Sequence, residues 1–581
     1  MLREEYDLVV IGGGPTGLTA ALAAASAGRT CVIVDATKKN QVQFSGPTGL
    51  FSKALRDASK KIDVGTLRKM GLKDVTVWKQ VQELTSDIVK ASGQSNLAAV
   101  QACRIPHLRG SARLMSSSEV EVTFTESNRS IPVRGKRILV ATGSTPYRMP
   151  GIPYDQMRIF DSDTIRMLTF LPKTVTIVGA GIIAIEFAKI FSRLDCKVTM
   201  LVRAKSLDVA LLRIGVDRDA ALQLQKDLCM NKVRIIFDTE VEEVIKEESP
   251  RNANTVRPMR IKLRKASTKE SQPHAEIRTE VLMTATGRSA NTRGMGLEGL
   301  GVNMDKDGAI LVNGNMETSV KGVYAAGDVL GAPSLASTGI EQGNAAVTHM
   351  FGFDSSSKSA WMLRTGGRDP KSLTANPLLY PVGIWTIPEM AFIGRTKEKA
   401  IDDGWEPEEL GEGLAQYSQT IRGRVQGINL GFLKLLFSKP DGVILGVHIL
   451  GEDACELIHY GTALAQSGKT VYEALGTVYT AVTFHELFRI AAMDAVRQLE
   501  VDAWSPFLTR LGLGEEETHN VQDVRKRLGE GGMSEDDCEE ICRALDQRAD
   551  QDEEREGTQV SFQQIMQVVQ KYRIPKPWYA P

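Results

Sequence analysis

Apolar runs with β-branched residues alternate with glycine turns and helix-forming stretches along most of the chain. Residues 8–11 form such a run after Asp7, the turn at 12–17 is rich in glycine, and residues 18–27 are rich in alanine. The same order of run, turn and helical stretch begins again at residue 174. Strands that alternate with helices predict parallel sheets, so we expect an α/β protein with two Rossmann-like domains.

The first glycine turn has the spacing Gly-x-Gly-x-x-Gly, formed by Gly12, Gly14 and Gly17. In such a turn the first glycine allows the chain to reverse, the second allows the backbone to approach a pyrophosphate, and the third allows the helix to pack on the strand. Asp35 ends the next apolar run, at the distance of about twenty residues typical of an acid that binds a ribose hydroxyl. The alternative, a glycine turn without a nucleotide, is disfavoured because the whole strand-turn-helix-acid unit is present.

A second turn of this kind is formed by Gly179, Gly181 and Ala184. The strand after its helix ends not in an acid but in Arg203 and Lys205. A ribose 2′-hydroxyl is bound by a carboxylate, whereas a 2′-phosphate is bound by guanidinium and ammonium groups. We therefore expect a nucleotide with a free ribose at the first site and NADPH at the second, although these two cations could also be solvated loop charges.

Composition fits a large soluble enzyme of three or four domains. The 71 basic and 71 acidic residues cancel, so no net charge favours nucleic acid or an acidic membrane. No apolar run approaches the length of a membrane span. About six residues precede the first strand, too few for a cleaved targeting peptide, so we expect a cytoplasmic protein unless the start of the chain is missing. The 7 cysteines lack metal-type spacing, which predicts reduced thiols and no metal site.

Three further glycine turns follow strand-like runs around residues 138–144, 282–288 and 322–329. Together with the first two turns, they make the chain resemble the flavoprotein disulfide reductases of the pyridine nucleotide-disulfide oxidoreductase family, over about residues 5–500. The resemblance implies FAD at the first site, with Asp328 on its ribityl chain, and a nicotinamide nucleotide at the second. Nucleotide contacts are also expected from the residues of these three turns, namely Thr142, Gly143, Gly287, Arg288 and Gly327.

The redox thiols of that family are missing. Its dithiol members carry Cys-x4-Cys shortly before the sequence found here at residues 52–56, but residues 43–51 contain no sulfur. Thiol-disulfide exchange requires a thiolate, so disulfide reduction at that place is excluded. The family's proton-handling histidine, placed by aligning Glu486, is replaced by Ala481, and His485 has the wrong spacing and is expected to be a packed or solvated helix-start residue.

One branch of the family, the soluble FAD-dependent pyridine nucleotide transhydrogenases, resembles this chain most in its local motifs. Matching segments include Ser52–Arg56, Phe160–Asp163, Thr286–Thr292, Pro333–Ser337, Thr386–Glu389 and Gly451–His459. The chain departs from that branch at Phe44, where a cysteine is usual, and at Ala481, where a tyrosine is usual. The resemblance implies that Lys53 and Glu186 form a pair beside the flavin and nicotinamide, with a surface ion pair as the alternative. It also implies that Ile182 replaces a gating tyrosine and leaves the nicotinamide side of the flavin more open.

These observations favour an oxidoreductase that transfers hydride between NADP(H) and NAD(H) through FAD. A diaphorase, quinone reductase or oxidase is the nearest alternative, since it also needs an open flavin and no thiols. A non-catalytic redox sensor or scaffold is a further alternative, against which the retention of Lys53 and Glu186 argues.

The predicted domains follow from these motifs. Residues 380–500, with alternating strands and helices, resemble the family's α+β dimerisation domain, so we expect a homodimer. Residues 501–581 lie outside the resemblance and predict a small helical extension that resembles a degenerate EF-hand. Its acidic loop is out of register for calcium ligands and offers Gln563 and Gln564 instead of a bidentate glutamate. We therefore expect a docking or capping module for an unknown protein rather than a calcium site. The predicted boundaries are 1–150 and 285–352 for the FAD domain, 151–284 for the NAD(P) domain, 353–379 for a linker, 380–500 for the interface domain and 501–581 for the extension.

Overall fold

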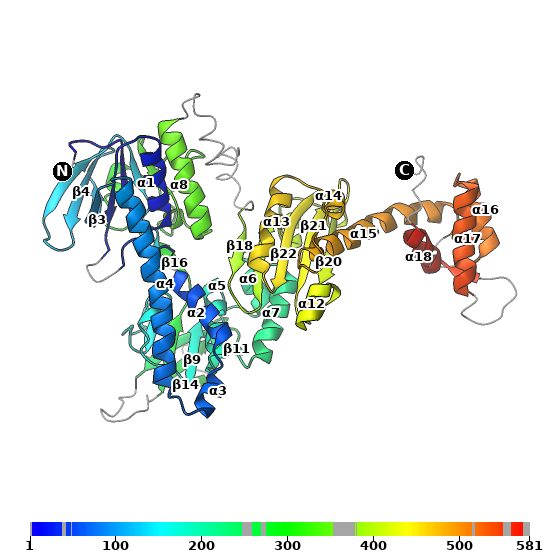
Figure 1. Cartoon of the computed structure of the whole chain (residues 1–581), viewed down its shortest axis with the longest axis horizontal. Coiled ribbons are helices and arrows are strands. Elements are labelled where there is room, and N and C mark those ends of the chain that lie inside the picture. Colours follow the sequence, from blue (N-terminus) through cyan, green and yellow to red (C-terminus); the bar gives the residue numbers. More distant parts are fainter. Residues whose placement is uncertain are drawn as a thin grey trace. The chain divides into compact units, whose positions relative to one another are not determined.

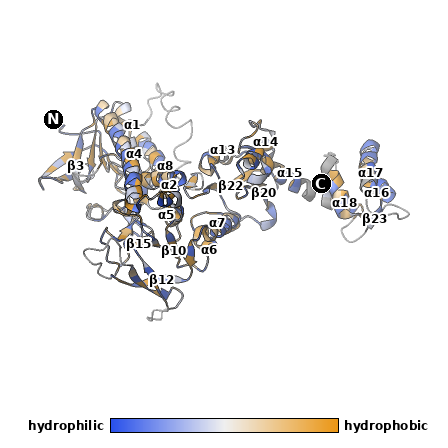
Figure 2. Cartoon of the chain, turned by 60° about the horizontal axis from the view of Figure 1, so that its bottom comes forward, coloured by the Kyte–Doolittle hydropathy of each residue, from blue (hydrophilic) through white to orange (hydrophobic). Residues whose placement is uncertain are grey.

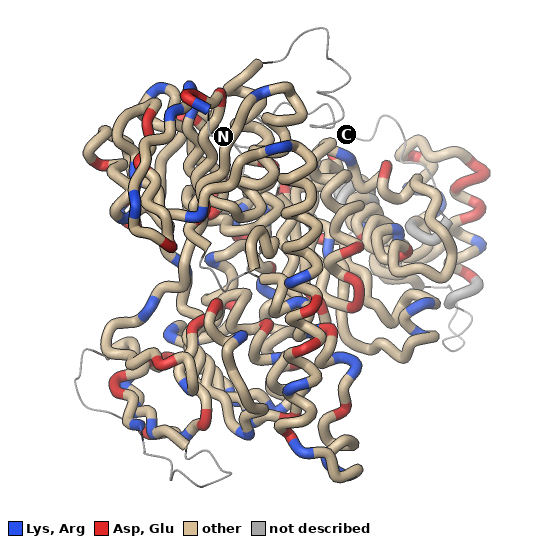
Figure 3. The backbone as a smooth tube through the Cα atoms, turned by 60° about the vertical axis from the view of Figure 1, so that its left-hand side comes forward, with Lys and Arg blue, Asp and Glu red and all other residues tan. Residues whose placement is uncertain are grey.

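The computed structural model describes residues 3–37, 42–47, 49–246, 258–268, 275–352, 378, 380–513, 518–549 and 559–572. The chain divides into two compact units, 1–394 with 450–458, and 395–449 with 459–581 (Figure 1). Lys, Arg, Asp and Glu are interspersed along the chain without separation by sign (Figure 3). No helix among the described residues is long and apolar enough to cross a membrane.

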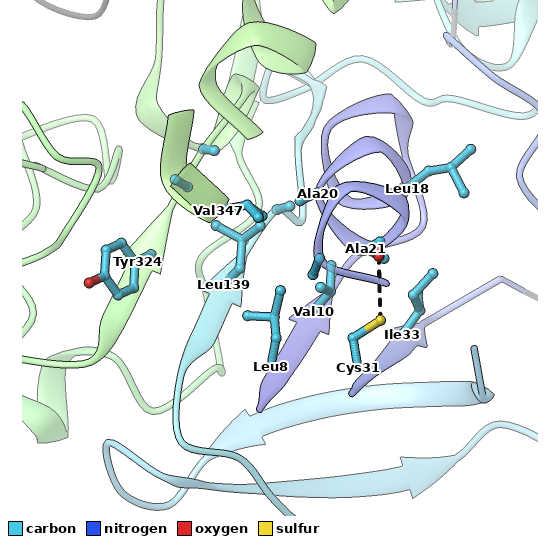
Figure 4. Close-up of a cluster of buried hydrophobic side chains, with 14 of the residues drawn as sticks. Leu8, Val10, Leu18, Ala20, Ala21, Cys31, Ile33, Leu139, Tyr324 and Val347 are labelled. Carbon is cyan, nitrogen blue, oxygen red and sulfur yellow. Dashed lines mark hydrogen bonds between the residues drawn. The ribbon is translucent and has the colours of Figure 1, made fainter. Parts of the chain in front are cut away.

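The predicted FAD domain contains a seven-stranded sheet with the order β17-β6-β1-β2-β3-β4-β5. Its central parallel strands β17, β6 and β1 are apolar and buried, and helices α1 and α8 pack against the sheet. Figure 4 shows Leu8, Val10 and Leu139 of the strands beneath Ala20 and Ala21 of α1 and Val347 of α8. The elements are β1 (Leu8–Ile11), α1 (Pro15–Ser26), β2 (Cys31–Asp35), β3 (His107–Leu114), β4 (Glu119–Phe124), β5 (Ser130–Arg134), β6 (Ile138–Val140), η2 (Glu298–Leu300), β17 (Val323–Ala325), η3 (Asp328–Leu330) and α8 (Ala336–Phe351).

The helices α1 and α8 pack closely because glycines of α8 face Thr16 of α1. A Cβ atom at Gly339 would lie 2.3 Å from Thr16 Oγ1, and one at Gly343 would lie 2.7 Å from the Thr16 carbonyl oxygen. Both distances are shorter than a van der Waals contact, so no larger residue fits at either position.

The predicted NAD(P) domain repeats the design with a five-stranded parallel sheet in the order β11-β10-β9-β15-β8. A three-stranded antiparallel sheet, β12-β13-β14, packs its apolar face against the first sheet. The elements are β8 (Ile159–Asp161), η1 (Ile165–Met167), β9 (Thr174–Val178), α5 (Ile182–Arg193), β10 (Lys197–Leu201), α6 (Leu207–Leu212), α7 (Arg218–Met230), β11 (Arg234–Ile236), β12 (Thr239–Ile245), β13 (Met259–Lys265), β14 (Ala275–Thr279) and β15 (Val281–Thr284).

The two dinucleotide-type domains are joined by two chain crossings that pair with each other. Strand β7 (Ser144–Pro146) is antiparallel to β16 (Arg288–Ala290), with Ser144 opposite Ala290. The rest of the first unit consists of α2 (Leu50–Lys61), α3 (Val64–Lys69), α4 (Asp74–Ala102), the antiparallel pair β18 (Val382–Ile384) and β19 (Glu389–Gly394), and the segment 450–458. Helix α2 packs on α4 and α5.

The second unit contains strand β21, buried at every position, between β20 and β22. Helix α15 packs on this sheet, and a Cβ at Gly413 of β20 would lie 2.3 Å from the Ala491 carbonyl oxygen. The elements are α11 (Lys397–Asp402), η6 (Pro407–Glu409), β20 (Leu410–Gln416), η7 (Tyr417–Gln419), α12 (Ile421–Gln426), β21 (Phe432–Ser438), α14 (Val471–Gly476) and α15 (Glu486–Arg510). The strand β22 (Ile444–Gly451) and the helix α13 (Ala454–Gln466) each have one end in the segment 450–458 of the first unit.

The C-terminal extension has its own hydrophobic core. It comprises β23 (Thr518–Asn520), α16 (Val521–Glu530), α17 (Glu535–Ala549), β24 (Gln559–Ser561) and α18 (Phe562–Tyr572), and β23 is antiparallel to β24. Hydrophilic residues are prominent on α16 and α17 and hydrophobic ones on α18 (Figure 2). Helix, strand and helix thus occur twice in order, α15-β23-α16 and α17-β24-α18, whereas the sequence indicated only the second set.

Helix α15 continues past residue 500, where the sequence predicts a domain boundary. Its residues Trp504, Phe507 and Leu508 are buried in the core of the extension. The predicted linker 353–379 and part of the acidic loop 546–556 lie outside the described residues, apart from 378 and 546–549. Among the residues that are described, no three His, Cys, Asp or Glu side chains are grouped to hold a metal ion.

Candidate active site

The first glycine turn combines two glycines that the fold requires with one that faces free space. Gly12 has a φ of +116°, and a Cβ there would lie 2.1 Å from the Ala141 carbonyl oxygen. A Cβ at Gly17 would lie 2.0 Å from the carbonyl oxygen of Gly12. A Cβ at Gly14, which directly precedes α1, would meet no described atom within 4 Å. The space at the N-terminus of α1 suits a pyrophosphate, which the helix dipole and free N–H groups stabilise.

Acidic and hydroxyl side chains surround this space. Asp35 Oδ1 accepts a hydrogen bond from the Gly13 N–H at 3.1 Å, and its Oδ2 is bonded to Thr37. Asp328 follows Gly327, whose φ is +82°, and its Oδ2 accepts from Ser144 Oγ at 2.8 Å.

A buried hydroxyl without a partner marks the start of α8. Thr338 is 1% exposed, and its Oγ1 forms no hydrogen bond with any described residue. Because buried polar atoms are normally paired, this hydroxyl fits a polar ligand group. The open turn, the two carboxylates and this hydroxyl together fit FAD.

Thr142 and Gly143 form the turn after β6. Thr142 Oγ1 donates to the Asn291 carbonyl oxygen at 2.7 Å, and Gly143 has a φ of +70° with open space at its Cβ position. Thr142 therefore ties the two crossings together, while Gly143 leaves room beside them.

The second glycine turn reproduces the first. Gly179 has a φ of +129°, and a Cβ there would lie 2.3 Å from the Ala285 carbonyl oxygen. A Cβ at Gly181, immediately before α5, would meet no described atom within 4 Å, and Ala184, in the first turn of α5, is fully buried. Gly287 has a φ of +128° and also faces open space. The turn thus offers a second pyrophosphate-sized space.

Arg203 and Lys205 lie on a loop whose backbone is hydrogen-bonded to Ile236 and Asp238. Val202 N donates to the Ile236 carbonyl oxygen at 2.9 Å, and Asp238 N donates to that of Ala204 at 3.0 Å. Both cationic side chains are exposed, and neither forms a hydrogen bond or ion pair with any residue that the structure describes. They are therefore available for an anionic ligand.

The guanidinium of Arg288, by contrast, is already paired within the protein. Its Nε donates to Ser144 Oγ at 2.8 Å, its Nη1 to Asp163 Oδ1 at 2.8 Å and its Nη2 to the Ser144 carbonyl oxygen at 2.8 Å. Since Ser144 also binds Asp328, Arg288 braces the crossing β7 against the end of β8. Nucleotide binding by Arg288 stays a prediction, which this pairing makes less attractive.

Lys53 and Glu186, separated by 133 residues in sequence, form the predicted pair. Lys53 Nζ donates to both carboxylate oxygens of Glu186 at 2.9 Å. The Glu186 side chain is 2% exposed and that of Lys53 is 30% exposed. Glu186 Oε1 also accepts the backbone N–H of Trp385 at 3.0 Å. The alternative of a surface ion pair is wrong, because the carboxylate is buried.

The segment 43–51, which lacks the family's redox cysteines, has one residue in the core and another beside the ion pair. Phe44 is 3% exposed, with a φ of +49°, and its ring centroid lies 4.6 Å from that of His107. The Phe44 side chain therefore joins the core of the FAD sheet. Gly49 adjoins the ion pair, since a Cβ there would lie 3.4 Å from Lys53 Nζ.

The position of the family's proton-handling histidine is taken by Ala481, which offers no base. Ala481 and His485 are exposed, and the His485 ring stacks on Phe488 with centroids 6.3 Å apart, as expected for a packed helix-start residue. Glu486 Oε2 is buried and forms no hydrogen bond within the described part of the chain.

Sequence reasoning missed the contacts that hold Glu186. The segment Thr386–Glu389 is a motif of the sequence, but nothing in it signals that the adjacent Trp385 N–H binds the carboxylate. The role of Ser144 between Asp328 and Arg288 also has no sequence signal, because a serine after a glycine turn is common.

Comparison with known proteins agrees with this geometry. Residues 6–343 match the pyridine nucleotide-disulphide oxidoreductase family, and residues 380–492 match its dimerisation domain. The soluble pyridine nucleotide transhydrogenase of Marinomonas sp. (strain MWYL1) is 30% identical over 506 residues, covering 86% of this chain and 100% of that protein. The enzyme of the same name from Mycobacterium tuberculosis (strain ATCC 25177 / H37Ra) is 31% identical over 502 residues, covering 85% and 98%.

Solved structures share the fold. A Cu(II) complex of the HOCl-induced flavoprotein disulfide reductase RclA from Escherichia coli has a TM-score of 0.69 at 21% identity, covering 84% of this chain and 100% of that one. LpdA from Mycobacterium tuberculosis has a TM-score of 0.69 at 21% identity, covering 84% and 99%. The family matches end at residue 492, before the extension.

Proposed function

Because the chain belongs to the pyridine nucleotide-disulphide oxidoreductase family, we propose that it transfers hydride between NADPH and NAD⁺ through FAD. Binding of FAD and of a nicotinamide nucleotide follows from the family, whereas the choice of NADPH and NAD⁺ is the proposal. The names of its transhydrogenase relatives support that choice.

One observation carries the proposal: the Lys53–Glu186 pair is intact where no thiol is present. Lys53 Nζ lies 2.9 Å from Glu186, and the preceding segment, residues 43–51, contains no sulfur. Hydride transfer between two nicotinamides requires neither a thiolate nor a protein base. The residues therefore keep the half of the family chemistry that involves nicotinamide and lack the half that reduces disulfides.

Each site residue has a role in this proposal. FAD, when bound, accepts a hydride from one nicotinamide and donates it to another. Gly12, Gly14 and Gly17 with the start of α1 would hold its pyrophosphate, Asp35 its ribose and Asp328 its ribityl chain. Lys53 would stabilise negative charge on the reduced flavin, and Glu186 would orient Lys53 and contact the carboxamide.

The second site would accept NADPH through Arg203 and Lys205, which are exposed and have no ion-pair partner among the described residues. Gly179, Gly181 and the start of α5 would hold the pyrophosphate, with Ala184 allowing close packing. NAD⁺ lacks the 2′-phosphate, and it would bind the same turn without these charges. The dimerisation-domain match supports a homodimer, and a cytoplasmic location and a docking role for the extension stay predictions.

The test is a turnover assay with NADPH and a thio-analogue of NAD⁺, run beside quinone and oxygen as acceptors. The expected result is reduction of the thio-analogue faster than either other acceptor. Faster quinone or oxygen reduction would replace the proposal with a diaphorase or an oxidase. No flavin reduction by NADPH or NADH would overturn catalysis altogether and favour a sensor or scaffold.

A further inference from the structure

Helix α2 presents three cations on one face, and each pairs with an acid from a different element. Lys53 binds Glu186 of α5, Arg56 binds Glu389 of β19, and Lys60 binds Glu452 at 3.0 Å. Residues at i, i+3 and i+7 share a helix face, so α2 connects the nicotinamide-type domain with β19 and the segment 450–458. The three pairs differ in burial: those of Lys53 and Arg56 have buried acids, while the Glu452 side chain is 38% exposed.

Arg56 is the most deeply buried of the three cations. Its side chain is 3% exposed, and its guanidinium donates to Glu389 Oε1, to Asp57 Oδ1 at 2.8 Å and to the Thr386 carbonyl oxygen at 3.3 Å. It also lies 5.3 Å from the ring centroid of Trp385. Arg56 therefore contacts both residues of the 385–386 segment.

Glu389 is fixed in turn from its other side. Its Oε2 accepts the Cys455 N–H at 3.0 Å, and its side chain is 7% exposed. A planar guanidinium bound to a carboxylate and a carbonyl has a fixed orientation that a lysine would not reproduce. Arg56 and Glu389 thus form a rigid support beneath residues 385–386.

The supported segment holds Glu186. Trp385 N donates to Glu186 Oε1 at 3.0 Å, the oxygen that also accepts from Lys53 at 2.9 Å. Oε2 accepts from Lys53 at 2.9 Å and more weakly from Ser52 Oγ at 3.5 Å. Without the Trp385 N–H, the carboxylate could rotate while remaining bound to the flexible lysine.

We propose that Arg56 is a positioning residue for the Lys53–Glu186 pair, acting with Glu389 through the backbone of Trp385 and Thr386. This inference rests on the proposed function only in assuming that the pair faces the flavin and nicotinamide. Misplacement of a reacting group by about 1 Å can cost about a hundredfold in rate. Loss of the support should therefore slow hydride transfer more than it weakens nucleotide binding.

The experiment compares Arg56→Lys, Glu389→Gln and the double variant Arg56→Met with Glu389→Leu. The double variant is included because removing one partner of a buried pair leaves an uncompensated charge that can prevent folding, whereas replacing both is often tolerated. Lys60→Met is the matched control, since it removes the exposed α2 pair and leaves Glu186 untouched. Flavin content and thermal melting establish folding for each variant.

Two readouts test positioning. Amide hydrogen exchange at Trp385 in the nucleotide-free protein should accelerate by roughly tenfold or more in the double variant and stay unchanged in Lys60→Met. The rate of flavin reduction by saturating NADPH should fall roughly tenfold to a hundredfold, with a retained isotope effect for C4-deuterated NADPH and an NADP⁺ dissociation constant within about threefold of wild type. Arg56→Lys should lie between wild type and the double variant.

The opposite results would overturn the inference. Wild-type exchange at Trp385 in a folded double variant would show that the Arg56 support does not hold the amide. Faster exchange with an unchanged reduction rate would show that the support is structural only. Absence of flavin reduction in the wild-type protein would instead be a failure of the proposed function, and the exchange measurement would still test the support.

Discussion

Selectivity for NADPH can be tested by removing the two exposed cations of the second site. Arg203→Gln with Lys205→Gln deletes the charges and keeps polar side chains of similar length. Because both residues are exposed on a loop whose backbone is anchored at Val202 and Ala204, we expect no effect on folding. Only a nucleotide that carries a 2′-phosphate should lose contacts.

The expected magnitude follows from the exposure of the two side chains. A hydrogen bond to a charged group is worth about 1.5–3 kcal/mol, but solvent screening and side-chain ordering favour the lower end or less at an exposed site. Taking about 1–1.5 kcal/mol for each contact gives about 2–3 kcal/mol for the pair. At about 1.36 kcal/mol per tenfold, kcat/KM for NADPH should fall roughly 30- to 150-fold.

The assay measures flavin reduction by NADPH and by NADH at low and high salt. The NADPH loss should shrink as salt rises, because exposed charges are screened, and NADH should change by less than about threefold. Lys197→Gln, at the opposite end of β10, is the control for a general loss of positive charge. Equal losses for the two nucleotides would refute the reasoning and show that Arg203 and Lys205 are structural.

Further predictions concern the cofactor turn, the thiols and acid stability. Gly14→Val should give a folded protein without a flavin absorption band, since a Cβ at this position meets no described atom within 4 Å and the side chain would fill the pyrophosphate space; normal flavin content would contradict the assignment of the FAD site. Alkylation at about pH 7.5 should label the exposed Cys103 and Cys229 and leave nicotinamide turnover intact, whereas loss of turnover would reveal a redox thiol. A backbone hydrogen bond from Thr30 is the main cause that lowers the pKa of Asp7 from 3.8 to about 2. Because Asp7 is only partly buried and solvent screens its interactions, Asp7→Asn should cost about 1 kcal/mol of unfolding free energy at neutral pH. Denaturant titrations should show this difference above about pH 4–5 and its disappearance as the pH falls toward about 2; a difference independent of pH would contradict the ionic origin.

The glycine turns could be predicted from sequence because their constraints are local. Gly12 and Gly179 adopt positive φ angles, which glycine adopts without steric cost and which the glycine spacing within each turn predicts. The absence of thiols in residues 43–51 was also readable directly from the sequence. These positions needed only short-range patterns.

The contacts around Glu186 could not be predicted because they join distant segments. Arg56 meets Glu389 across 333 residues and Trp385 meets Glu186 across 199, and no periodicity records such pairs. The Lys53–Glu186 pair itself was expected only through resemblance to a family. The pairing of Arg288 with Ser144 and Asp163 was likewise invisible, since an arginine after a glycine turn looks available for a phosphate.

The continuity of α15 changes how the extension could be separated from the rest of the chain. A truncation at residue 500 would cut inside a helix, leave its last carbonyl groups without helical partners and remove Trp504, Phe507 and Leu508 from the core they share with α16, α17 and α18. The chain between Glu486 and Arg510 is helical and contains no loop at which a protease or a designed truncation could separate the extension. The same helix, α15, packs on β20 and contributes to the core of the extension. A ligand that shifts the extension would therefore act on the helix that packs on β20.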